Sequence, residues 1–193
     1  MLAPKTLWRA RPALIPLAIA LSAIVAMACA TDVEVEPDAL ECYSGGMPPS
    51  AEARGSIELG WGTDDFRPIE PDQTLTLQPG LASPHYFEIH TRITDLEPGN
   101  PDAHDDPSNP HTLVSVFDED GQRVDVHACG SRRAYQPDGE SSDALVSWRN
   151  VTVATDFIDQ ADGARARIVA EILDANGGYA ENEVWVTVEV EDR

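Results

Sequence analysis

The sequence predicts an all-β fold in which two sheets pack face to face as a sandwich. Short runs between positions 57 and 190 alternate apolar and polar residues, the pattern of strands with one buried face. Glycine, proline, asparagine and aspartate separate the runs, and neither a strand–helix–strand spacing nor an internal repeat occurs. Many short strands joined by turns are typical of a two-sheet sandwich.

The expected strands follow one another in order along the chain. Each carries apolar residues at every second position, and the earlier ones cover 57–61, 75–77, 87–93, 114–116, 124–126 and 145–153. The sequence from Asp118 to Gly121, Asp-Glu-Asp-Gly, lies between two of these runs, so we predict a hairpin turn there. A calcium loop is the weaker interpretation, because the bidentate glutamate that closes such a loop is missing.

The carboxyl-terminal part has the clearest pattern. Valines occupy positions 184, 186, 188 and 190 and alternate with mostly polar residues, and positions 165–172 alternate in the same way. The turn-forming residues 174–178 lie between these two runs, so a hairpin is predicted, and one helical turn is expected at 155–160. About seven to eight strands favour a β-sandwich.

The first 28 residues have the order of an export signal. Three basic residues precede an apolar run from 13 to 28, which is shorter than the about 20 residues that a membrane-spanning helix needs. We therefore expect residues 1–28 to be removed as a signal peptide. Two interpretations of the cleavage stay open: Ala26-Met27-Ala28 before Cys29 is typical of lipid attachment to that cysteine, and Ala28-Cys29-Ala30 also fits ordinary signal cleavage.

Residues 29–55 are expected to form a lipid-anchored flexible tether, and residues 56–193 the β-sandwich domain. The tether is acidic, rich in proline and glycine, and without sustained periodicity. Three cysteines are an odd number for an exported chain. With Cys29 lipidated or removed, Cys42 and Cys129 remain to pair in a disulfide; two unpaired thiols are the alternative.

Three stretches of the chain resemble uncharacterised bacterial lipoproteins with a single immunoglobulin-like domain: Ile57-Glu58-Leu59-Gly60-Trp61-Gly62, His85-Tyr86-Phe87-Glu88-Ile89 after Pro79-Gly80, and Ala164 to Asp192. The resemblance implies an immunoglobulin-like β-sandwich behind a lipid on Cys29 and no known activity. A fibronectin-type or other Greek-key sandwich is the alternative fold, which the sequence does not separate from it. Ala26 and Met27 depart from the leucine and small residue usual in such signals. An acid after the lipidated cysteine often marks inner-membrane retention in these proteins, so Ala30 implies the outer membrane. A secreted or periplasmic soluble protein is the alternative.

Charge limits the possible partners. Residues 29–193 carry 10 basic and 34 acidic side chains, formally −24. Such a surface repels nucleic acid and anionic lipid head groups, so we expect no nucleic-acid partner. The expected function is that of a non-enzymatic cell-envelope lipoprotein: an extracytoplasmic protein-interaction or structural module, held to the membrane by its lipid and bound to an envelope or extracellular protein.

One loop offers an alternative function, the binding of a divalent cation. The stretch from Glu97 to His111 is dense in oxygen and nitrogen donors, and the candidate ligands for Ca²⁺ or Zn²⁺ are Asp102, His104, Asp105, Asp106 and His111. A solvated turn is the simpler interpretation, because proline, aspartate and asparagine are ordinary loop residues. We therefore expect no cofactor, with Ca²⁺ or Zn²⁺ as the alternative.

Carbohydrate binding and catalysis have less support. Tyr86, Trp148 and Trp185 lie on expected strands, where they either stack on sugar faces or pack at sheet edges. The sequence contains none of the short motifs of serine or metal hydrolases or of phosphate-binding loops. His90 and His127 are expected on outer strand faces as ordinary surface residues, so no enzymatic activity is expected.

Overall fold

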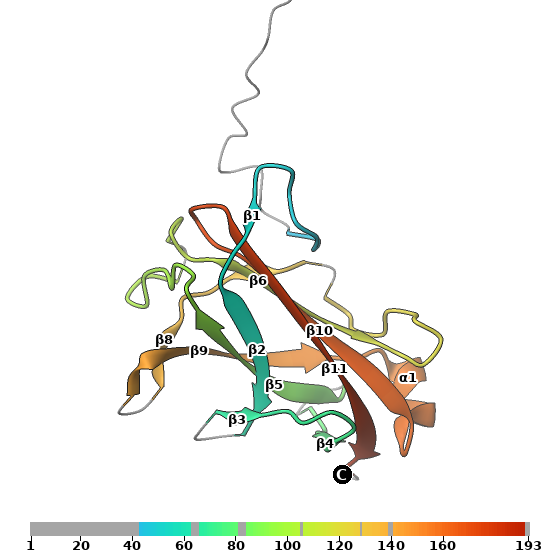
Figure 1. The fold of residues 1–193 in the computed structure, drawn as a ribbon. Helices are drawn as coiled ribbons and strands as arrows, with labels where there is room; N and C mark the ends of the chain where they lie inside the picture. Colours follow the sequence, from blue (N-terminus) through green and yellow to red (C-terminus); the bar gives the residue numbers. More distant parts are fainter. Residues whose placement is uncertain are drawn as a thin grey trace, which may run out of the picture. The chain divides into compact units, whose positions relative to one another are not determined.

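The computed structural model describes residues 43–62, 66–80, 84–104, 106–127, 129–138 and 141–191. They form two β-sheets that pack face to face, which confirms the predicted all-β sandwich (Figure 1). Within this described part, no helix is long and apolar enough to cross a membrane.

The strands divide into a five-stranded and a six-stranded sheet. The five-stranded sheet has the order β3 (Arg67–Pro68), β2 (Ser56–Trp61), β5 (Tyr86–Thr94), β9 (Ser141–Thr152) and β8 (Gln136–Asp138). The six-stranded sheet has the order β1 (Glu52–Ala53), β11 (Gly178–Val190), β10 (Arg165–Leu173), β6 (His111–Phe117) and β7 (Ser131–Arg132), and β4 (Thr74–Leu77) also pairs with β11.

The strand order is that of an immunoglobulin constant domain. Lettered A to G along the chain, β2, β5, β6, β8, β9, β10 and β11 give the sheets A-B-E-D and G-F-C. Both β1 and β4 lie parallel to β11, on the edge that β10 leaves open. The last two long strands form the predicted hairpin, with Ile168 opposite Val184 and Leu173 opposite Tyr179.

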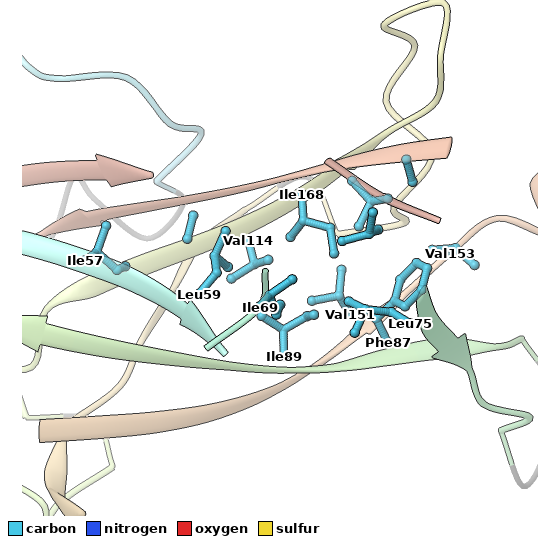
Figure 2. Close-up of a cluster of buried hydrophobic side chains, with 14 of the residues drawn as sticks. Ile57, Leu59, Ile69, Leu75, Phe87, Ile89, Val114, Val151, Val153 and Ile168 are labelled. Atoms are coloured by element: carbon cyan, nitrogen blue, oxygen red, sulfur yellow. The ribbon is translucent and has the colours of Figure 1, made fainter. Parts of the chain in front are cut away.

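The core lies between the inner faces of the two sheets (Figure 2). Alternation explains it, because every second residue of each long strand points inward; Ile89, Val116, Ile168 and Val186 are fully buried. Burying each such side chain contributes about 1.5–3 kcal/mol. The helix α1 (Thr155–Ala161) joins β9 to β10 and adds Phe157 to this core, at the position predicted for a helical turn.

Two parts of the fold differ from the expectation. The run at 124–126 is not a strand: Val124 donates to the Val116 carbonyl, but Val126 then donates to Thr152 in the other sheet and its side chain is 51% exposed. The chain crosses between sheets there, and alternation over three residues does not reveal a crossing.

The second difference concerns the tether, which was expected to extend to residue 55. Tyr43 is only 3% exposed and packs with Leu113, Leu173 and Tyr179 on the outer face of the six-stranded sheet. Further along, β1 pairs with the start of β11. The prediction is therefore wrong for residues 43–55, because a single buried tyrosine and a two-residue strand give no periodic signal.

Candidate functional site

The loop proposed to bind a cation is organised around a buried asparagine. Asn109 is 2% exposed; its Oδ1 accepts from the Asn100 amide at 2.7 Å, and its Nδ2 donates to the carbonyls of Ala103 (2.8 Å) and His104 (3.1 Å). The carboxylate of Asp106 accepts from the Ser108 amide and hydroxyl and from the Asn100 side chain. These hydrogen bonds lower the pKa of Asp106. The polar side chains of this loop therefore form hydrogen bonds that stabilise the loop itself.

The candidate cation ligands do not converge among the residues that the structure describes. His111 is 7% exposed, and its Nε2 accepts from the Arg132 guanidinium at 3.1 Å. Burial and the nearby Arg132 charge both lower the pKa of His111. Asp105 lies outside the described residues, and no group of three or more potential ligands occurs among those within them.

The predicted turn after β6 is present, although only one of the two strands expected beside it is formed. Asp118 Oδ1 accepts from the amides of Asp120 (3.0 Å) and Gln122 (2.8 Å), and Gly121, with a φ of 77°, donates its amide to the Asp118 carbonyl. The aspartate side chain is therefore engaged in shaping the turn.

The prediction that His90 is exposed is wrong. His90 lies on the outer face of β5, as expected from its position, but is 1% exposed, and its Nε2 is 3.6 Å from the Glu88 carboxylate. Phe66 packs over Gly60, the residue directly opposite His90 on β2, and thereby covers this part of the sheet. His127 is exposed but does not lie in a strand.

Asp174 joins three segments and was predicted only as a turn residue. Its side chain is fully buried and accepts from the amides of Glu97, Asn176 and Gly178 and from the Arg54 guanidinium. Burial by itself would raise the pKa of this carboxyl, but the hydrogen bonds outweigh it and lower the pKa. The carboxylate is a structural node that binds the hairpin to the loop after β5 and to the chain after β1.

A second polar group fastens the amino-terminal segment to the outer face. The Tyr179 hydroxyl lies 2.9 Å from Glu171 and 2.8 Å from Glu181, and Glu171 also accepts from the Gly46 amide. Burial and these two carboxylates raise the pKa of Tyr179. The Tyr43 hydroxyl donates to the Gly46 carbonyl, so the segment is held by its backbone and its side chains.

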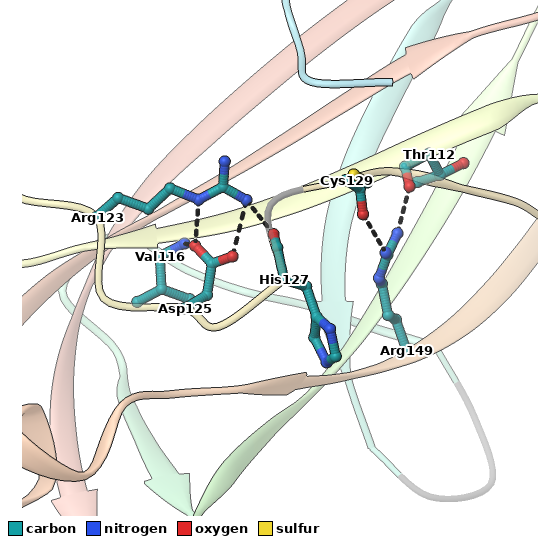
Figure 3. Close-up of polar contacts among 7 residues, drawn as sticks. All are labelled: Thr112, Val116, Arg123, Asp125, His127, Cys129 and Arg149. Atoms are coloured by element: carbon teal, nitrogen blue, oxygen red, sulfur yellow. Dashed lines mark hydrogen bonds and ion pairs between the residues drawn. The ribbon is translucent and has the colours of Figure 1, made fainter. Parts of the chain in front are cut away.

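The segment that crosses between the sheets forms polar contacts with β6, and Arg149 forms others nearby (Figure 3). Arg123 forms a two-point ion pair with Asp125, at 2.9 and 2.8 Å, and Asp125 also accepts from the Val116 amide. Arg149 reaches inward from β9 and donates to the carbonyls of Thr112 on β6 and of Cys129. Burial, with the charge of Arg133, lowers the pKa of Arg149. This guanidinium therefore links the two sheets.

A row of arginine and aromatic side chains, of which Arg165 is exposed and the others are half-buried, crosses the outer face of the six-stranded sheet. Arg167 on β10 lies opposite Phe117 on β6 and opposite Trp185 on β11. The Arg167 guanidinium is 4.7 Å from the Phe117 ring centroid, and that of Arg165 is 5.0 Å from the Trp185 ring. We name Phe117, Arg165, Arg167 and Trp185 the arginine–aromatic row.

The aromatics considered for sugar stacking are engaged in other contacts or not described. Arg165 covers Trp185, and the Tyr86 hydroxyl donates to Gln78 at 3.0 Å. The side chain of Trp148 lies outside the described part.

The predicted lipidation and disulfide cysteines are only partly within the described chain. Cys129 is disulfide-bonded. Cys29 and Cys42 lie outside the described residues, so lipidation of Cys29 and the pairing of Cys42 with Cys129 stay predictions.

No family model matches the sequence, and no curated protein matches it. Among solved structures, the crystal structure of CopC from Methylosinus trichosporium OB3b is similar over 64% of this chain and 89% of that chain, with 12% sequence identity and a TM-score of 0.33. A likeness at this TM-score carries no argument about function, so the function is argued from the chain itself.

Proposed function

We propose that the protein is a non-enzymatic cell-envelope lipoprotein, anchored to a bacterial outer membrane through Cys29, whose immunoglobulin-like domain binds another envelope or extracellular protein. The arginine–aromatic row is the observation that carries this proposal. Tryptophan and arginine are the residues most enriched at the energetic centres of protein interfaces.

The row is suited to binding because its side chains are already held in place. The Arg167 guanidinium stacks on the Phe117 ring and forms an ion pair with Glu183 at 2.9 Å. These contacts restrict the orientations of both side chains. Fixed side chains lose less conformational freedom when a partner binds, which favours affinity. The side chains of Arg165 and Arg167 nevertheless stay 50% and 31% exposed, so they are available for contact.

The amino-terminal segment supports the anchored arrangement. The chain advances by fourteen positions from Cys29 to Tyr43, where it is already packed on the domain. At about 3.3–3.6 Å per residue, fully extended, this connection spans at most about 50 Å. A lipid on Cys29 would therefore keep the domain near the membrane surface. Pairing of Cys42 with Cys129 fits this arrangement, because Cys129 is disulfide-bonded and the chain on the carboxyl side of Cys42 lies beside it, with Tyr43 and Gly130 in a backbone bridge.

Site-specific photo-crosslinking in native membranes tests the interaction. A crosslinking amino acid at position 185 is expected to capture one reproducible protein, and Arg167→Ala in the same chain should reduce that capture strongly. The matched control is a crosslinker at Asn150, an exposed residue on the outer face of the other sheet. No reproducible product from position 185, or equal capture from both positions, would count against the interaction surface.

The anchor has a separate test. The intact mass of the protein purified from membranes should correspond to a chain that begins at Cys29 and carries acyl chains. A mass without acyl chains would refute the anchor and leave a secreted or periplasmic protein.

A further inference from the structure

The edge of β11 that faces away from β10 is paired at its two ends and unpaired between them. On this side β1 pairs with residues 178 and 179, and β4 pairs with residues 187–190 (Figure 1). Within the described part of the chain, no other strand pairs with β11 on this side. We name residues 180–184, which lie between the two short strands, the open edge.

The topology of the sandwich leaves this stretch unpaired. The amides of Arg54 and Asp72 donate to the carbonyls of Tyr179 and Trp185, one at each end of the open edge. Between these two bonds the chain turns away at Gly55, with a φ of 67°, and comes back at Asp72, with a φ of 61°. The intervening strands β2 and β3 belong to the other sheet, so neither of them pairs with the open edge.

Backbone hydrogen-bonding groups of the open edge point to the side that has no strand. Bonding between β11 and β10 uses the even-numbered residues of β11, as the bond from the Val188 amide to the Ala164 carbonyl at 2.8 Å shows. Glu181 and Glu183 therefore direct their N–H and C=O groups to the opposite side. An added strand would give these groups main-chain partners.

Solvent reaches the open edge from both faces of the sheet. Glu181, Asn182 and Glu183 are all exposed, although they lie in the interior of a strand of 13 residues. Alternation turns Asn182 inward, and its Nδ2 donates to the Ile57 carbonyl of β2 at 3.0 Å. An inward side chain of a covered strand would be buried, so the exposure of Asn182 shows that the sandwich is open along this edge.

The side chains beside the open edge favour a basic occupant. Glu181 and Glu183 extend onto the outer face, and the Glu183 side chain stays 49% exposed despite its ion pair with Arg167. Two copies paired along this edge would bring their carboxylates together, which disfavours a second copy as the occupant. A strand with lysine or arginine at alternate positions would instead place cations beside both carboxylates.

We propose that the open edge binds an extended, basic segment of another protein, which adds to the six-stranded sheet as a further strand. Main-chain bonds to Glu181 and Glu183 provide the affinity, and cationic side chains at every second position provide the selectivity. From Tyr179 to Trp185 the edge is about 20 Å long at about 3.3 Å per residue, which accommodates about five residues. This inference goes beyond the proposed function, because it assigns a second contact surface and requires neither the lipid nor the arginine–aromatic row.

Residue-resolved hydrogen exchange on the full-length protein tests the proposal. In the protein alone, the amides of Glu181 and Glu183 should exchange fast, whereas those of Asn182 and Val184, which bond to β10, should exchange slowly. The probes are synthetic peptides of eight residues that alternate arginine with valine, isoleucine, threonine or tyrosine. At least one of them should slow exchange at Glu181 and Glu183 several-fold.

Backbone methylation of the best peptide separates strand addition from charge attraction. Only every second residue of an added strand directs its N–H toward β11, so N-methylation of one alternate set should abolish the protection and N-methylation of the other set should keep it. Replacing each arginine of the peptide with glutamate should also remove the protection.

Charge substitutions in the protein complete the test. The double variant E181Q with E183Q should weaken binding of the arginine peptide several-fold. The matched control, E189Q with E191Q, removes the same charge where β4 already lies beside the chain, and it should leave binding unchanged.

Each other outcome overturns the proposal. Exchange that no peptide slows would leave the two glutamates as a guard against edge pairing. Slow exchange at Glu181 and Glu183 before any peptide is added would mean that the edge is already covered, by a second copy if the protection rises with protein concentration and by the chain itself if it does not. Equal protection by both methylated peptides, or by the glutamate peptide, would contradict strand addition by a basic segment.

Discussion

At the scale of single residues, the protein is held together by carboxylates that accept several backbone amides. Asp174 collects three amides and one guanidinium, and Asp125 joins an amide to Arg123. Such charge-assisted bonds are stronger than neutral ones, and their buried acceptor is costly to remove. An acidic chain can thus use part of its charge for internal structure.

Asp174→Asn tests this role. The amide keeps the shape but loses the charge and one acceptor oxygen, so the free energy of unfolding in urea should fall by about 2–3 kcal/mol at pH 7. Asp120→Asn at the exposed tip of the turn after β6 is the control and should change it by less than about 0.5 kcal/mol. Equal, small effects would mean that Asp174 is only a turn residue.

The comparison of the parent with Asp174→Asn also gives a prediction about pH. Because the folded-state pKa of Asp174 lies below its ordinary value of about 3.9, its contribution is complete above that pH. The contribution is lost as pH falls through the folded-state pKa. The stability difference between the parent and Asp174→Asn should therefore shrink only below about pH 4; a difference that disappears already at pH 6 would assign it to another group.

Sequence patterns placed side chains on the correct face more reliably than they predicted burial. Period-two alternation put His90 on the outer face of β5, which is correct, but it contains no information about Phe66, a loop residue that covers that face. Asp174 was identified as a turn former, and its contacts with Glu97 and Arg54 depend on long-range packing. The Asp118 turn depends only on local bonds and was predicted.

At the scale of elements, the amino-terminal segment from Tyr43 to Ala53 behaves as part of the domain. It covers Leu113, Leu173 and Tyr179, apolar groups that would otherwise face water on the outer side of the sheet. The sequence showed its glycines, prolines and charge, which are typical of a linker, and the one aromatic that fixes it carries no periodic signal.

Replacing Tyr43 with alanine measures this docking. Loss of a buried aromatic ring should reduce the free energy of unfolding by about 3 kcal/mol and make the preceding chain more sensitive to limited proteolysis. Met47→Ala in the same segment is the control, because Met47 is 50% exposed, and it should have little effect. If the segment were not packed on the domain, both substitutions would leave the free energy of unfolding unchanged.

The loop between β5 and β6 supports a prediction about cations. Asp106 and Asn109 already use their oxygens in hydrogen bonds within the loop. Excess Ca²⁺ or Zn²⁺ is therefore expected to leave the thermal midpoint unchanged relative to chelator. Binding at 100 times the dissociation constant would add about 2.7 kcal/mol and raise the midpoint by several degrees, which would restore the loop as a cation site.

At the scale of the whole molecule, the two sheets are joined by polar contacts as well as by the core. The Arg149 side chain extends from β9 to the Thr112 carbonyl on β6, and Asn182 on β11 donates to the Ile57 carbonyl on β2 at 3.0 Å. The two-sheet sandwich followed from the number and spacing of strands. The strand order and these links did not, because each depends on residues distant in sequence.

Arg149→Met should lower the free energy of unfolding by about 2 kcal/mol, since it keeps the length of the side chain and leaves two carbonyls without their donor. Arg149→Lys should fall between parent and methionine variant, because a single ammonium group cannot reproduce the planar fork. Chemical denaturation measures both. A methionine variant as stable as the parent would show that the desolvation penalty of the guanidinium equals the free energy that its hydrogen bonds contribute.

The parallel pairing of β1 and β4 with β11 has a consequence for how the chain acquires its structure. Residues 52 and 53 pair with 178 and 179, and residues 74–77 pair with 187–190, so contacts span more than one hundred residues. A chain that emerges amino end first, during synthesis or during passage across a membrane, cannot complete the six-stranded sheet until residue 190 is free. Such non-local pairing slows folding. The chain would therefore stay unfolded while it is synthesised or translocated. The release of its carboxyl-terminal strand, rather than local strand formation, would determine when it folds.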